Sequence, residues 1–92
     1  MELIFAPTGD LVNDFGMKNI KIRLPTGAVL GDLLAKIDAN FGNVLPAALW
    51  NREDRRFRGP VVLMSDGFVV RGAESPLRNG QEIQAIKVKV GG

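Results

Sequence analysis

The stretch LGDLLAKIDANFG, residues 30–42, decides the fold class of this chain. Its apolar residues recur at the three- and four-residue spacings that gather side chains on one side of an α-helix. They are Leu30, Leu33, Leu34, Ile37 and Phe41. Asp32 and Lys36 stand four residues apart in the order that favours a helix, and Gly42 is suited to cap its end. The stretch therefore predicts an amphipathic helix that packs its apolar stripe on another element.

On both sides of this helix the sequence has the two-residue period of β-strands. Before it, ELIFA (2–6) is a short apolar run, and MKNIKIRLP (17–25) alternates, with PTGDLVNDFG (7–16) as the turn between them. After it, VVLM (61–64) and FVVR (68–71) flank Asp66-Gly67, a pair favoured in two-residue hairpin turns. EIQAIKVKV (82–90) supplies a fifth strand.

The order of these elements predicts an α+β domain of two layers, with the helix on one face of the sheet. We expect the first and last strands to be adjacent at the centre. That is the β-grasp (ubiquitin-like) arrangement, a five-stranded mixed sheet with one main helix. The domain spans residues 1–90, and a flexible diglycine tail follows at 91–92. The predicted core includes Ile22, Leu33, Leu34, Ile37 and Val62.

Two segments depart from simple patterns. In the last strand, Ile83 and Ala85 alternate on odd positions, whereas Ile86, Val88 and Val90 alternate on even ones. Either a β-bulge or a strong twist near residues 85–86 reconciles the two halves, or the first half of the strand is central and the second half has one face in water. The segment 44–59 is irregular, with a short helical turn predicted around 47–50 and then a charged loop. Trp50 is interpreted as a lid over the helix end.

Composition excludes several chemistries. The 92 residues include no cysteine, histidine or tyrosine, which removes thiolate or imidazole metal ligands and the usual nucleophilic pairs. No pair of acidic residues has a recognisable catalytic spacing, so the chain is not expected to be an enzyme. The net charge of +2 does not favour nucleic-acid binding. No apolar run is long enough to cross a membrane, and we expect a soluble cytoplasmic protein.

Two sets of residues are candidates for binding a partner. The loop NREDRRFRG (51–59) carries Arg55, Arg56 and Arg58, which either lie on a solvated loop or contact an acidic patch of a partner. Phe68, Val70 and Leu77 either form part of an exposed apolar sheet face or pack in the core.

Four stretches in this order resemble the ubiquitin-like sulfur carriers of the MoaD/ThiS family: LIFA (3–6), LPTGAVLGDLLAKI (24–37), SPLRNGQEI (75–83) and the diglycine Gly91-Gly92. The likeness covers nearly the whole chain except residues 44–59, whose length is similar to the longer MoaD-type members. Val29 stands where the family often has a helix-capping Thr, so the cap must come from elsewhere, such as Thr26, or be missing.

The resemblance implies a mechanism. A ThiF/MoeB-like activating enzyme would use ATP to adenylate the carboxylate of Gly92, and a sulfur donor would convert the adenylate to a thiocarboxylate. Gly91 and Gly92 lack side chains and could thread a narrow channel. The protein would bind no cofactor itself. A larger synthase subunit is a further expected partner, with molybdenum- or tungsten-cofactor synthesis as the expected pathway and thiamine or cysteine synthesis still open.

Two other functions remain open on the sequence. A ubiquitin-like modifier would share the activation step and then form isopeptide bonds between Gly92 and lysines of other proteins. A β-grasp interaction module would carry the Gly-Gly sequence incidentally, and would keep its function after Gly91 and Gly92 are removed.

Overall fold

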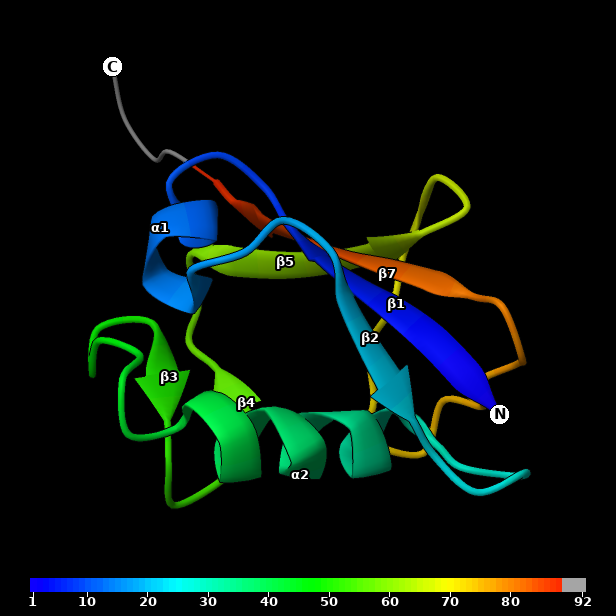
Figure 1. Cartoon of the computed structure of the whole chain (residues 1–92). Coiled ribbons are helices and arrows are strands. Elements are labelled where there is room, and N and C mark those ends of the chain that lie inside the picture. Colours follow the sequence, from blue (N-terminus) through cyan, green and yellow to red (C-terminus); the bar gives the residue numbers. More distant parts are fainter. Residues whose placement is uncertain (89–92) are drawn as a thin grey trace.

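The computed structural model describes residues 1–88 of the chain (Figure 1). Its elements follow in the order β1 (Glu2–Pro7), α1 (Leu11–Phe15), β2 (Ile20–Arg23), α2 (Leu30–Phe41), β3 (Trp50–Asn51), β4 (Arg56–Phe57), β5 (Val61–Ser65), β6 (Phe68–Val69) and β7 (Glu82–Lys87). The predicted flexibility of residues 91–92 lies outside the described residues.

Five strands form the main sheet in the order β2-β1-β7-β5-β6. The pair β1–β7 is parallel, and the pairs β1–β2, β5–β7 and β5–β6 are antiparallel. The first and last strands therefore lie side by side at the centre of a mixed sheet, with α2 across one face (Figure 1). This is the predicted β-grasp arrangement, and the expectation is confirmed.

The core lies between α2 and the inner face of the sheet. Alternate strand residues point toward the helix, and the helix contributes its predicted apolar stripe. Leu33, Leu34, Ile37 and Ile22 are buried as expected, but Val62 is only half-buried. The buried residues of β5 are its neighbours Val61 and Leu63, so the prediction for Val62 was wrong by one position. An all-apolar strand does not reveal its phase, because period-2 arguments need a polar residue to mark the exposed side.

The start of α2 is capped by backbone from a distant loop. The amide of Leu30 donates to the carbonyl of Ser75 at 2.8 Å, and the amide of Gly31 donates to that of Ala73 at 2.7 Å. The side chain of Asp32 accepts from the amide of Val29 at 2.9 Å. The missing Thr is thus replaced by Asp32 and by two carbonyls of the segment before β7, and no contribution from Thr26 is needed.

Two short elements were not predicted. The turn segment before β2 contains α1, a single helical turn that buries Leu11 and Phe15 and ends at Gly16 in a left-handed conformation (φ 79°). The irregular segment before β5 contains the β3–β4 hairpin, which forms a separate two-stranded sheet. Elements this short contain too few residues to show the apolar periodicity by which helices and strands are predicted from a sequence.

β7 resolves the change of phase in its sequence without a bulge. Its pairing with β5 is continuous from Val61↔Lys87 to Met64↔Gln84. Ile83 and Ala85 face the core, whereas Ile86 is half-buried and Val88 is exposed. The second explanation was therefore the right one: Ile86 belongs to the outer face of the sheet, and Val88 continues its phase.

None of the helices formed by residues 1–88 has the length and apolar character needed to cross a membrane.

Candidate functional site

The outer face of the sheet carries an apolar patch that runs from the end of β7 across β5 to β6. Cross-strand pairing places Val62 next to Ile86, and Met64 next to Val69, on the face away from α2. Val88 continues the phase of Ile86 and is 45% exposed. We call Val62, Met64, Val69, Ile86 and Val88 the outer apolar patch. Each is at least partly accessible to solvent.

The opposite end of the same face is polar. Glu2 pairs with Arg23 across β1 and β2, and Ile4 lies between Lys21 and Glu82. The Glu2 and Arg23 side chains form an exposed ion pair at 3.7 Å. The apolar residues of this face thus run from the second half of β7 across β5 to β6, whereas the surroundings of Ile4 on β1 are charged.

The β5–β6 hairpin presents one aromatic side chain to solvent. Phe68 is 76% exposed, although the other five aromatic residues of the chain contact one another in and around the core. These five are Phe5, Phe15, Phe41, Trp50 and Phe57, with ring centroids 4.8–6.2 Å apart in the contacting pairs. An aromatic ring left in water while all others are packed is a candidate for contact with a partner.

The other two apolar candidates, Val70 and Leu77, are less exposed to solvent than Phe68. Val70 is half-buried and packs against the core from the end of β6. Leu77 is buried, and its amide donates to the carbonyl of Ala28, which fixes the loop that caps α2. For Leu77 the alternative of core packing holds, and it is not available to a partner in the folded protein.

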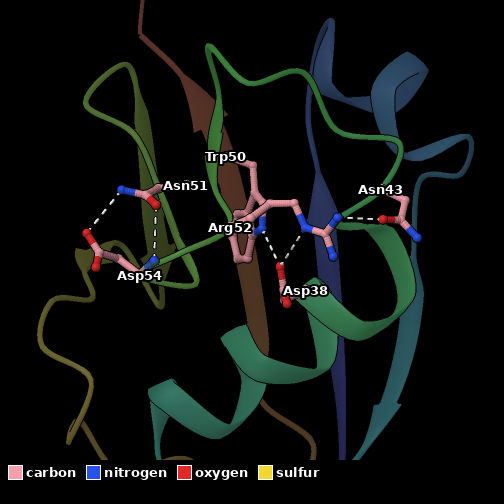
Figure 2. Close-up of polar contacts among 6 residues, drawn as sticks. All are labelled: Asp38, Asn43, Trp50, Asn51, Arg52 and Asp54. Carbon is pink, nitrogen blue, oxygen red and sulfur yellow. Dashed lines mark hydrogen bonds and ion pairs between the residues drawn. The ribbon is translucent and has the colours of Figure 1, made fainter.

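The β3–β4 hairpin is held against α2 by Trp50. The indole N–H donates to the carboxylate of Asp38 at 2.9 Å, and Arg52 lies 3.7 Å from the same oxygen (Figure 2). Arg52 also donates to Asn43 at 2.5 Å. Trp50 is therefore the expected lid over the end of the helix, but one anchored by a polar network.

Gly42 makes room for this network. Its φ of −55° is helical, so it is not a left-handed cap. A Cβ at this position would lie 2.5 Å from the backbone carbonyl oxygen of Asp38 and 2.6 Å from its carboxylate oxygen, and the backbone atom cannot move aside as a side chain could. The glycine predicted as a helix end is thus required by the close approach of Asp38.

The predicted arginines lie on the same hairpin and differ in their contacts. Arg58 donates to the carbonyl of Ala47 at 2.6 Å, and Arg56 lies 3.6 Å from the carboxylate of Asp54. Arg55 occupies the left-handed region (φ 53°) and makes no ion pair with any of residues 1–88. Arg55, Arg56 and Val70 line one cleft, so the structure brings together candidates that the sequence presented separately.

Gly91 and Gly92, the predicted carriers of the chemistry, lie outside the described residues. Within residues 1–88 no group of three His, Cys, Asp or Glu side chains could hold a metal ion.

Comparison with solved structures identifies the class of fold. Small archaeal modifier protein 1 (SAMP1) from Haloferax volcanii superposes with a TM-score of 0.81 at 15% identity, over 100% of both chains. A Pyrococcus furiosus protein provisionally identified as molybdopterin converting factor, subunit 1, gives 0.72 at 15% identity, over 97% of this chain and 99% of that one. Urm1 from Trypanosoma brucei gives 0.70 at 12% identity, over 99% and 95%.

The sequence matches no protein-family model and no curated protein. At these identities the structural likeness shows the fold, and the protein is a ubiquitin-like β-grasp protein. This confirms the fold that the four resembling stretches predicted.

Sequence reasoning missed the outer apolar patch as a unit. The signal was present in the even-numbered apolar residues Ile86 and Val88, which have no place in the core once Ile83 and Ala85 fill it. The contribution of β5 could not be found in the same way, because its apolar run has no polar residue to separate its two faces.

Proposed function

We propose that this protein is a sulfur carrier whose Gly92 carboxylate is adenylated by an activating enzyme and then converted to a thiocarboxylate. The observation that carries the proposal is the part of the outer apolar patch at the end of β7, formed by Val62, Ile86 and Val88, because Val88 precedes Gly91 by only three residues in the sequence. A partner docked on this patch would have the tail within reach. The order of resembling stretches along the sequence and the ubiquitin-like fold support the same function.

The chemistry requires little from the chain itself. A carboxylate oxygen of Gly92 attacks the α-phosphorus of ATP, and pyrophosphate leaves. Hydrosulfide supplied by the donor then attacks the acyl carbon, AMP leaves with the transferred oxygen, and sulfur replaces that oxygen at the terminus. The activating enzyme supplies the nucleotide site, and the carrier supplies the acyl group and the docking surface. The protein therefore acts as a cosubstrate.

The proposed recipient of the sulfur is a precursor of molybdopterin or of the related tungsten cofactor. In this role the chain is the small subunit of a synthase and inserts its tail into a larger subunit. Support comes from the segment 44–59, which is long as in MoaD-type carriers, and from the likeness to the Pyrococcus furiosus protein.

A second candidate is conjugation to proteins. The high TM-score with a protein named as a modifier, SAMP1, favours it. The two functions share the adenylation step and differ afterwards, because a lysine amine replaces the sulfur donor as the nucleophile. Covalent conjugates of higher mass that disappear when Gly92 is deleted would assign this role.

The first experiment addresses the tail. Protein whose measured mass corresponds to a chain ending at Gly92 is incubated with a purified ThiF/MoeB-like activating enzyme, ATP and a sulfur donor. We expect intact mass spectrometry to show one oxygen replaced by sulfur. One alanine added after Gly92 should abolish the reaction, since it displaces the carboxylate by about 3.5 Å from the adenylation site. Sulfur acquired by the extended protein without trimming contradicts the proposal.

The second experiment addresses the patch. Val88→Asp places a charge in the outer apolar patch, and Val44→Asp makes the same change at a valine that is 65% exposed on the loop after α2. We expect Val88→Asp to raise the KM for the carrier at least tenfold, and Val44→Asp to leave it within about twofold. Equal effects of both variants would show that the patch has no part in docking.

A further inference from the structure

A cleft of about 850 Å³ opens between α2 and the edge of the sheet formed by β5 and β6. This volume lies in the range of ligand-binding clefts, about 300–1,000 Å³. Its floor is apolar and includes Leu30, Leu34, Leu63 and Val70, side chains that also belong to or pack on the core. The floor alone would suit many apolar ligands and identifies none.

The charge of the residues that line the cleft narrows the choice of ligand. Three arginines and one aspartate line the cleft: Arg55, Arg56, Arg71 and Asp54. The whole chain has twelve basic and ten acidic residues, so nine of each remain elsewhere and cancel. The entire formal net charge of +2 is therefore located at this cleft.

Two of the arginines are free to bind an anion. Asp54 lies 3.6 Å from Arg56 and partly neutralises it. Arg55 and Arg71 are exposed, and neither side chain forms a hydrogen bond or ion pair with any residue of the described part of the chain. A guanidinium can bind a carboxylate through two parallel hydrogen bonds, so these two positions are suited to recognise carboxylates.

The hairpin holds Arg55 in place. Immediately before it, the side chain of Asn51 accepts from the amide of Asp54 and donates to its carboxylate, both at 3.0 Å (Figure 2). Arg55 itself has a left-handed backbone conformation, which is unfavourable for a residue with a Cβ. The closed turn thus fixes the backbone from which the Arg55 side chain extends to line the cleft.

From the apolar floor and the unpaired arginines we infer that this cleft binds an acidic segment of a partner protein, with aliphatic side chains on the floor and carboxylates at Arg55 and Arg71. A nucleic acid fits less well. It would leave the aliphatic floor without apolar contacts, and the one aromatic ring in the lining, Phe57, already packs against Trp50. The site is separate from the tail chemistry, although Val62 and Val69 border both the cleft and the outer apolar patch.

The test uses a short synthetic peptide of alternating leucine and glutamate as the probe, with a leucine–lysine peptide and single-stranded oligouridylate for comparison. Binding is followed by NMR on the intact chain, through the methyl signals of Leu34, Leu63 and Val70. No activating enzyme is present, so the result does not depend on the proposed sulfur-carrier function. We expect saturable shifts at these methyls with the acidic peptide only, and weaker binding as salt is raised.

Charge reversal supplies the matched variants. Arg55→Glu with Arg71→Glu should weaken binding of the acidic peptide at least tenfold. Lys18→Glu with Lys21→Glu makes the same change in net charge at exposed residues away from the cleft and should alter binding by less than about threefold. The proton–nitrogen spectrum of each variant verifies that it is folded.

Three results would overturn the inference. They are an acidic peptide that does not bind, binding that the Arg55/Arg71 reversal leaves unchanged, and shifts centred on Ile86 and Val88 in place of the cleft. Oligouridylate binding that is lost in the Arg55/Arg71 variant would assign the cleft to nucleic acid and equally reject the acidic segment.

Discussion

The two short hairpins of this protein have pairings of equal length and opposite roles. β3–β4 pairs Trp50 with Phe57, and both rings pack inward against the aromatic residues of the core. β5–β6 pairs Ser65 with Phe68 and leaves the ring of Phe68 in water. The first hairpin uses its aromatic residues for stability. The second leaves its aromatic ring 76% exposed, so the two hairpins differ in how much their aromatic residues contribute to stability.

The largest expected effect comes from Trp50→Ala. Trp50 is 1% exposed and its removal leaves a large cavity under β3–β4. We expect a loss of about 3–5 kcal/mol in the free energy of unfolding, measured by urea denaturation. Trp50→Phe keeps much of the ring and should cost less. A near-neutral Trp50→Ala would mean that this hairpin does not depend on the core.

The next effect concerns the polar anchors of the two hairpins. Asp38→Ala removes the acceptor of the Trp50 indole and the partner of Arg52, and should cost about 1–3 kcal/mol because a buried donor is left unsatisfied. The control is Arg78→Ala, which breaks the pair with Asp66 between two largely exposed side chains, leaves the turn residue Asp66 in place, and should cost at most about 1 kcal/mol. Equal losses in urea denaturation would remove the proposed difference between the hairpins.

A smaller effect tests the turn of β5–β6. Gly67 has a φ of 82°, so Gly67→Ala forces a side chain into the left-handed region and should cost about 1–2 kcal/mol. Gly59→Ala, before β5, meets no atom within 4 Å of the new Cβ and has no positive φ. It should be neutral or slightly stabilising in thermal unfolding, since it restricts the unfolded chain. A loss of stability in both variants would point to a general effect of the methyl group.

The smallest effect on stability is expected for Phe68→Ser. The ring is mostly in water, so the free energy of unfolding should change by no more than about 0.5 kcal/mol. Unlike Trp50→Ala, this variant should leave the fold intact and still weaken binding to an activating enzyme if Phe68 contacts that enzyme. A marked loss of stability would place the ring in a packed environment and end its candidacy as a contact.

The sequence predicted β5–β6 and not β3–β4, for a physical reason. Asp66-Gly67 is a local signal, because the turn type requires a positive φ at both positions and few residue pairs accept it. β3–β4 depends on contacts with distant residues: Phe57 packs on Phe5, and Trp50 donates to Asp38. Its own sequence is dominated by charges that are typical of a loop, so nothing local indicates a hairpin.

The sequence predicted the candidate site only in part, as it did the two hairpins. Phe68 was named as part of an apolar strand after the Asp66-Gly67 turn and Arg55 as part of a charged run, and both are exposed. Leu77 was an equally plausible candidate in the sequence, but it is buried because the loop that contains it caps α2. No local sequence pattern reveals this long-range contact. The cleft could not be predicted at all, because Arg71 and Arg55 come from different loops that meet only in the folded chain.

The central position of β7 has a consequence for the order in which the protein folds. Without β7, the sheet separates into two local hairpins, β1–β2 and β5–β6, each of which can form quickly from neighbouring residues. β7 joins them, but its pairing with β1 connects residues nearly the whole chain apart, such as Phe5 and Ile83, and such closure is slow. We expect closure of β7 to be the late step of folding. The outer apolar patch combines Ile86 of β7 with Val62 of β5, so it would be complete only on molecules whose folding is finished, and the proposed docking surface would distinguish them from incomplete ones.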